Sequence, residues 1–136
     1  MMQRFSFLAA VGLLVLAATG ARADDKKSTT PPYVHTVIFY LKADAPSGTA
    51  DEVLADCHAM LAKIASVRLL KAGKSVEKAG PPTRTDYAVG LLVLFDDAEG
   101  FKAYATDPLH LKFVEKYRKY FDVTKLAVYD FVDAKK

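Results

Sequence analysis

The sequence of 136 residues contains a single cysteine, Cys57. One thiol cannot form a disulfide within the chain, so the fold has to be stabilised by its own apolar core or by a core shared with a partner chain. Cys57 falls on the apolar stripe of a predicted helix, where a small buried side chain is a far commoner role for cysteine than a nucleophile. The cysteine content therefore favours neither a disulfide scaffold nor thiol chemistry.

The sequence also lacks an apolar run long enough to cross a bilayer. Arg4, the apolar run from Phe5 to Ala18 and the small-x-small sequence Ala21-Arg22-Ala23 together form the pattern of a cleaved signal peptide. This run is shorter than the about 20 residues that span a membrane, and no cysteine follows it that could carry a lipid. We therefore expect residues 1–23 to direct export, to the periplasm or outside the cell, with no stable membrane insertion after cleavage.

A strong excess of charge is missing as well. Without Arg4 and Arg22, the remaining 113 residues carry 17 basic and 16 acidic side chains, which is a net charge of +1. A nearly neutral domain has no electrostatic reason to bind nucleic acid. The modest basic cluster at Lys112, Lys116, Arg118 and Lys119 is expected to be the solvated face of a helix.

Hydrophobic periodicity predicts four strands and three helical segments after a polar leader at 24–33, which is expected to be disordered. The first helix is expected to begin with a capping box at Thr49–Glu52 and to carry an apolar stripe as far as Ile64. Asp97 and Asp107 are expected to cap two further helices, with Pro108 at the first position of the last one. The strands are predicted at 34–41, 67–76, 87–95 and 125–132.

Gly73, inside the second predicted strand, suggests a bulge or a close approach of another backbone. The last helix carries an apolar stripe at i, i+3, i+4, i+7 and i+11. The stripe consists of His110, Phe113, Val114, Tyr117 and Phe121.

The element order is βαββαβ, which predicts one α+β domain of the ferredoxin-like class over residues 34–132. Residues 133–136 form a short polar tail.

The first and third strands are apolar on both faces. Strands with one face in water usually alternate between apolar and polar residues, whereas strands covered on both sides do not. The predicted helical segments are enough to cover only one face of a four-stranded sheet. We therefore expect a homodimer in which two sheets pack face to face.

The three histidines do not predict a metal site. His35, His58 and His110 lie on separate predicted elements, and no carboxylate or cysteine accompanies them at ligand spacing. His58 lies at the margin of a helical stripe and is expected at the surface. We expect neither a metal nor a cofactor.

The stretch from Tyr104 to His110 brings a phenol, a helix start and an inward-facing imidazole together. His110 could exchange a proton near neutral pH, and the adjacent helix N-terminus favours its neutral form. Tyr104 could donate a hydrogen bond to a carbonyl oxygen that becomes negative. In the alternative interpretation, His110 caps the helix or bonds across the core and Tyr104 packs with a satisfied hydroxyl group.

Three motifs resemble those of a known family. The segment His35–Lys42 is similar to its opening motif, Phe101-x-x-Tyr104-x-x-x-Pro108-x-His110 to its second, and Tyr129–Phe131 to its third. The family is that of the stress-responsive α/β-barrel (Dabb) domains. The resemblance implies a dimeric α/β barrel in which two ferredoxin-like sheets close on each other.

One branch of that family, the olivetolic acid cyclases, implies a chemistry for the site. These cofactor-free cyclases use a histidine and a tyrosine six residues before it, and His110 and Tyr104 stand at those positions, while His35 matches a further pocket histidine. An exported protein would not meet the coenzyme A thioesters on which this branch acts.

Two functions of different class follow. The first is a module that binds a small apolar or aromatic ligand in the barrel. The second is a cofactor-free acid/base enzyme, cyclase-like or monooxygenase-like, with His110 as base and Tyr104 as the donor that polarises a carbonyl group. The ligand-binding residues expected under both are His35, Val37, Phe39, Tyr104, His110 and Phe113.

Overall fold

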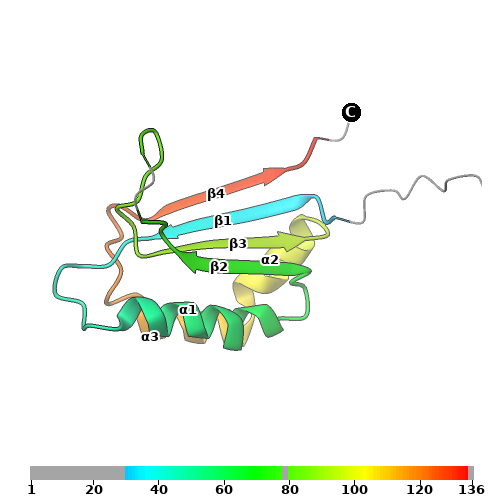
Figure 1. The fold of residues 1–136 in the computed structure, drawn as a ribbon. Helices are drawn as coiled ribbons and strands as arrows, with labels where there is room; N and C mark the ends of the chain where they lie inside the picture. The colour runs from blue at the N-terminus through cyan, green and yellow to red at the C-terminus, as the bar shows by residue number, and fades with distance from the viewer. Residues whose placement is uncertain (1–29, 78–79, 135–136) are drawn as a thin grey trace, which may run out of the picture.

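A computed structural model describes residues 30–77 and 80–134 of the chain. The predicted signal peptide and most of the predicted leader lie outside these residues, and so do residues 135 and 136. The order of elements confirms the predicted βαββαβ ferredoxin-like arrangement (Figure 1). The elements are β1 (Tyr33–Phe39), α1 (Thr49–Ala59), a short 3-10 helix η1 (Leu61–Lys63), β2 (Leu69–Lys74), β3 (Val89–Phe95), α2 (Ala98–Thr106), α3 (Pro108–Tyr117) and β4 (Ala127–Val132).

The four strands form one sheet in the order β2-β3-β1-β4. Each neighbouring pair is antiparallel, and β1 pairs with β3 from Tyr33↔Phe95 to Phe39↔Val89. The two most apolar segments of the chain thus form the centre of the sheet, whereas β2 and β4 form its edges. The central position of β1 and β3 does not by itself explain why their sequences lack alternation, because alternation depends on whether both faces of the sheet are covered.

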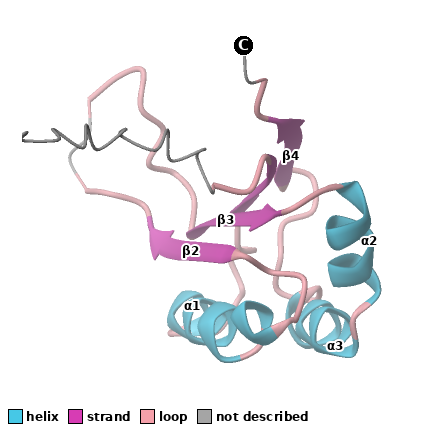
Figure 2. Ribbon diagram, turned by 90° about the vertical axis from the view of Figure 1, so that its right-hand side faces the viewer, coloured by secondary structure: helices cyan, strands magenta, loops and turns pink. Residues whose placement is uncertain are grey.

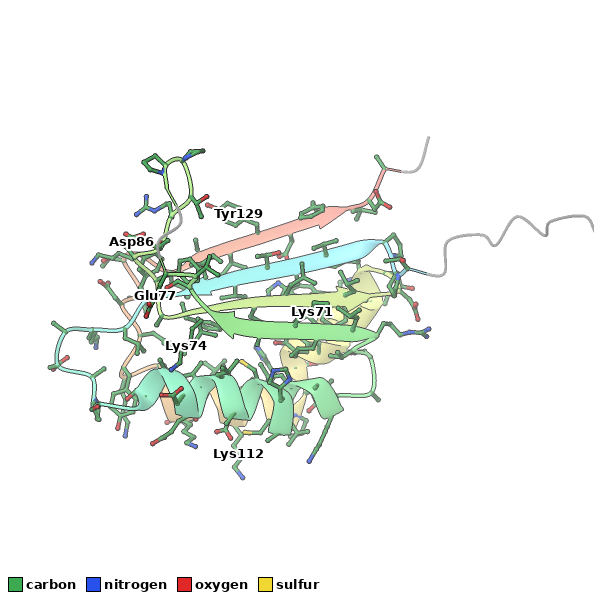
Figure 3. All side chains as sticks on the ribbon, viewed as in Figure 1. Lys71, Lys74, Glu77, Asp86, Lys112 and Tyr129 are labelled. Atoms are coloured by element: carbon green, nitrogen blue, oxygen red, sulfur yellow. The ribbon has the colours of Figure 1, made fainter. Side chains whose placement is uncertain are left out.

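All the described helices lie against one face of the sheet (Figure 2). The core between these layers is made of fully buried side chains, among them Val53 and Cys57 of α1 and Val89, Val93 and Phe95 of β3. On the far side of the helix layer, Lys112 points away from the sheet (Figure 3). Because Val53 and Cys57 are buried there, the apolar stripe predicted for the first helix faces the core.

The helix caps are partly as predicted. Asp97 accepts a hydrogen bond from the Gly100 amide at 2.8 Å and begins α2, and Asp107 accepts one from the Leu109 amide at 2.8 Å and begins α3. The predicted capping box at Thr49 is wrong. Gly48 is the N-cap, with a φ of 88° that favours glycine, and no side chain caps the helix. The Thr49 hydroxyl group instead donates to the Pro46 carbonyl oxygen at 2.7 Å.

The prediction for Gly73 is also wrong. This residue pairs in regular register with Gly90 of β3, and a side chain built on it would meet no atom within 4 Å. Neither a bulge nor a close backbone approach is present there. The strand is also shorter than the predicted range 67–76, because pairing with β3 extends only from Leu69 to Lys74.

The face of the sheet opposite the helices is mainly apolar. None of the described helices covers it, and Tyr129 and Phe131 on the edge strand β4 are 62% and 55% exposed. Figure 3 shows Tyr129 on β4 and Lys71 on β2, at opposite edges of the sheet. We call this the outer face. Strand alternation assigns to it Val34, Thr36, Ile38, Leu69, Lys71, Leu92, Leu94, Tyr129 and Phe131.

Candidate functional site

A cavity of about 260 Å³ lies between the sheet and helices α2 and α3. Most of its wall is apolar, with side chains from β1, β3, α3 and the segment before β4. The structure places all six of the expected ligand-binding residues around this single cavity, and their role in binding stays a prediction. These residues are His35, Val37, Phe39, Tyr104, His110 and Phe113.

His110 enters the cavity from the first turn of α3. Its Nδ1 lies 3.0 Å from the Ala105 carbonyl oxygen. Because a carbonyl can only accept, Nδ1 carries the proton, and Nε2 is the nitrogen with a free lone pair. Burial lowers the pKa of His110, and the neighbouring His35 adds to this, against the opposing effects of Ala105 and Asp107. His110 is therefore a neutral imidazole at pH 7, with a basic nitrogen available to a bound molecule.

Tyr104 lies beside His110 on the last turn of α2. Its ring centroid is 4.6 Å from that of His110 and 5.9 Å from that of His35, and the residue is only 1% exposed. Burial raises the pKa of its phenol, so the hydroxyl group keeps its proton at neutral pH and can act as a donor.

The Tyr104 hydroxyl group is not sealed in the core. No hydrogen bond engages it within the part of the chain that the structure describes, where Ser66 Oγ is the only fully enclosed side-chain oxygen or nitrogen without a partner. The Tyr104 oxygen is therefore not fully enclosed, and Tyr104 is one of the residues that line the cavity.

His35 is held by a residue that the sequence analysis did not single out as part of the site. His35 Nδ1 donates to Asp130 Oδ1 at 2.6 Å. The two residues are direct partners in the β1–β4 register, so their side chains share one face of the sheet. Asp130 fixes the orientation of a buried ring that also contacts Phe101 and Tyr104, and it leaves His35 Nε2 free. Strand alternation alone could not reveal this pair, because the contact depends on the register between two distant strands.

The imidazole of His35 and the phenol of Tyr104 lie at the inner end of the cavity, and more exposed side chains border its mouth. His35 and Tyr104 are 6% and 1% exposed, whereas Val123 and Val128 are 68% and 48% exposed. Val114, predicted to be buried on the helical stripe, is 39% exposed and also borders the opening. A ligand would thus enter past apolar side chains and meet the imidazoles and the phenol last.

The remaining candidate residues lie apart from this cavity. His58 is exposed on α1, and burial raises the pKa of the Cys57 thiol to about 12, which leaves it unreactive at neutral pH. Within residues 30–77 and 80–134, no three histidine, cysteine or carboxylate side chains converge as a metal site would require. In the same residues, no helix combines the length and the apolar character that a bilayer span demands.

Comparison with known proteins is consistent with this architecture. The model of the stress responsive A/B barrel domain family (Dabb) matches residues 34–133. No curated protein matches the sequence.

Three solved structures show the same fold. A Dabb family protein with a ferredoxin-like fold from Mesorhizobium loti is 25% identical, with a TM-score of 0.61 over 76% of this chain and 97% of its own. A dimeric protein of unknown function and ferredoxin-like fold from Bacteroides fragilis is also 25% identical, with a TM-score of 0.58 over 74% and 94%. A hydroxynitrile lyase from Passiflora edulis is 18% identical, with a TM-score of 0.61 over 78% and 97%, and shows likeness of fold alone.

Proposed function

We propose that this chain, which belongs to the stress responsive A/B barrel domain (Dabb) family, binds a small apolar or aromatic ligand in the cavity beside His110. One observation carries the proposal. The cavity of about 260 Å³ has a mainly apolar wall, and three of its four polar side chains, His35, Tyr104 and His110, lie together away from the fourth, Arg118. Binding sites for small molecules have this composition, in which apolar contacts supply affinity and a few polar groups set orientation.

A substitution at the mouth tests this proposal without disturbing the core. Val128 borders the opening and is 48% exposed, so Val128→Trp should obstruct entry. Val132→Trp is the matched control, because Val132 lies on the same strand and the same face, is 61% exposed and does not line the cavity.

The probe is benzylacetone, a neutral aromatic ketone, and the measurement is an NMR titration that follows the His110 and His35 ring signals. We expect saturable shifts in the wild type and in Val132→Trp, and weak or no binding in Val128→Trp. Equal binding by both tryptophan variants, or no shift of either ring in the wild type, would contradict a ligand site in this cavity.

The second candidate is a cofactor-free acid/base enzyme, and the state of His110 favours it. Nε2 of the neutral ring could take a proton from the carbon next to a ketone, while Tyr104 donates a hydrogen bond to the oxygen of the resulting enolate. Return of the proton from His110 to carbon completes a turnover without any other reactant. The hydroxynitrile lyase from Passiflora edulis supports the idea that this fold can hold an enzyme.

Deuterium exchange separates the two candidates. An enzyme of this kind should exchange the protons next to the carbonyl group of benzylacetone with solvent faster than buffer does. His110→Ala should abolish this exchange while binding only weakens. Exchange at the buffer rate in the wild type, with binding intact, would leave the binding module as the function.

We further propose a homodimer that buries the outer face, so that two sheets close into a barrel. The apolar side chains of that face support it, as does the dimeric protein from Bacteroides fragilis. Phe131→Glu places a charge on the outer face, whereas Val132→Glu places it on the other face of the same strand. Light scattering should give about twice the monomer mass for the wild type and Val132→Glu, and a lower mass for Phe131→Glu. A wild-type monomer in dilute solution would refute the dimer.

Export remains a proposal that rests on residues 1–23, which lie outside the described residues. We propose that cleavage after Ala23 releases a chain that begins at Asp24. Intact mass measurement on protein from fractionated source cells should find that chain in the exported fraction. The full-length mass in the cytoplasmic fraction would refute it.

A further inference from the structure

A permanent positive charge stands at the mouth of the cavity. Arg118 lines the cavity, and the other described residues that line it include no lysine, arginine, aspartate or glutamate. Arg118 follows the last residue of α3 with helical backbone angles, φ −52° and ψ −33°, and its side chain is 67% exposed. Arg118 belongs to the basic cluster expected on a solvated helix face. The residue is solvated, but it also lines the cavity, as do the exposed Val123 and Val128.

The cation and the proposed base lie on one ridge of α3. His110, Val114 and Arg118 follow each other at intervals of four residues, and all three line the cavity. A rise of 1.5 Å per residue separates His110 from Arg118 by about 12 Å along the helix axis. The side chain of Arg118 leans toward the helix N-terminus, which brings its guanidinium group closer to the opening. The cavity is therefore neutral and polar at its inner end, apolar along its length and cationic at its mouth.

The present partner of Arg118 leaves it able to bind another anion. Glu115 contacts it at 3.2 Å (Nε to Oε2) and at 3.5 Å, where the terminal Nη2 faces Oε1. Both side chains are about 70% exposed, and an exposed pair of this kind contributes little free energy. A guanidinium group has five N–H donors, so several remain free for a carboxylate that approaches from the cavity.

We propose that the cavity selects apolar ligands that carry a carboxylate group at the end opposite to the part held near Tyr104 and His110. This inference rests on the proposed function that the cavity binds a small apolar molecule. The carboxylate group stays at the mouth, where it keeps part of its hydration and meets Arg118, because burial at the inner end would remove it from water without a cationic partner. Aryl-alkanoic and keto acids belong to this class.

A pair of probes that differ only in charge tests the selection. The two compounds are 5-phenylpentanoate and 5-phenylpentanamide, and calorimetric titration at low salt measures both dissociation constants. We expect the wild type to bind the acid about fivefold more tightly than the amide, which is the size of an exposed charge pair. Arg118→Gln should weaken the acid to the level of the amide, and Arg118→Lys should keep part of the preference. Glu115→Gln should increase the affinity for the acid, because it removes the competing carboxylate.

The outcomes separate this inference from the proposed function. Equal affinity of the wild type for acid and amide, with both blocked by Val128→Trp, would overturn the charge selection and leave the ligand site standing. An acid preference that Arg118→Gln does not reduce would also overturn it. Failure of both probes to bind the wild type would overturn the inference together with the ligand site. The preference should shrink in 1 M salt, because an exposed ion pair is screened.

Discussion

Two buried tyrosines offer a direct test of which hydroxyl group serves the cavity and which serves the fold. Tyr104 and Tyr117 are 1% and 0% exposed, so Tyr→Phe removes one oxygen from an enclosed ring in each case. The Tyr104 hydroxyl group has no partner within the described residues. The Tyr117 hydroxyl group donates to Asp56 Oδ2 at 2.7 Å and joins α3 to α1.

The expected free energies differ because the two partners differ. A hydrogen bond to a charged acceptor contributes about 1.5–3 kcal/mol, but Asp56 is partly exposed and keeps Lys116 as a partner at 2.8 Å. We therefore expect Tyr117→Phe to lower the free energy of unfolding by about 1–1.5 kcal/mol. Tyr104→Phe breaks no hydrogen bond of this kind and should change the free energy of unfolding by less than about 0.5 kcal/mol.

Binding should change in the opposite sense. If Tyr104 donates to a ligand carbonyl group, loss of a neutral hydrogen bond of about 1 kcal/mol weakens benzylacetone binding about fivefold. Tyr117→Phe should leave the dissociation constant unchanged.

Urea unfolding and calorimetric titration of both variants measure these quantities. A Tyr104→Phe protein that loses more than about 1.5 kcal/mol of stability and binds normally would refute the placement of this hydroxyl group in the cavity.

Two further predictions concern the imidazoles. Burial lowers the pKa of His110, and only the neutral ring can accept a proton. Under the enzyme candidate, the rate of exchange next to the ketone should therefore rise with pH through a midpoint below about 6.5 and stay level above pH 7. A midpoint above about 6.5 would contradict the buried environment of His110. Under the enzyme candidate, Asp130→Asn weakens the bond that orients His35 and should slow exchange about tenfold, equivalent to about 1.4 kcal/mol. Asp133→Asn, on the same end of the chain, should not slow it, and equal rates in the two variants would remove Asp130 from the site.

Local signals in the sequence were sufficient for most of the fold. The caps at Asp97 and Asp107 depend on residues within three positions, so the helix starts could be predicted from the sequence. A local pattern gave the wrong prediction at Thr49, where a capping box was expected. Gly48, at φ 88°, is the N-cap there, and the threonine hydroxyl group donates to the Pro46 carbonyl oxygen. At Gly73 a regular antiparallel pair with Gly90 replaced the expected bulge, and this pairing depends on a strand that follows later in the chain.

The contacts of the candidate site are likewise of two kinds, those that local spacing predicts and those that depend on the pairing of distant strands. Tyr104 and His110 are six residues apart on consecutive helices, so helical spacing could bring them together. The contact between His35 and Asp130 joins residues 95 positions apart and requires the β1–β4 register. Arg118 follows His110 and Val114 at intervals of four residues, so helical spacing could have placed it beside the site, but its position in a basic cluster favoured a solvated helix face instead.

Native mass spectrometry of the protein purified from its source tests the central claim most directly. A ligand held in each cavity predicts a mass above that of the bare polypeptide, lost on activation as one small molecule per chain and reduced in Val128→Trp but not in Val132→Trp. Repeated preparations that carry no bound molecule, together with no uptake of benzylacetone or 5-phenylpentanoate when these are added, would contradict a ligand-binding cavity at His110.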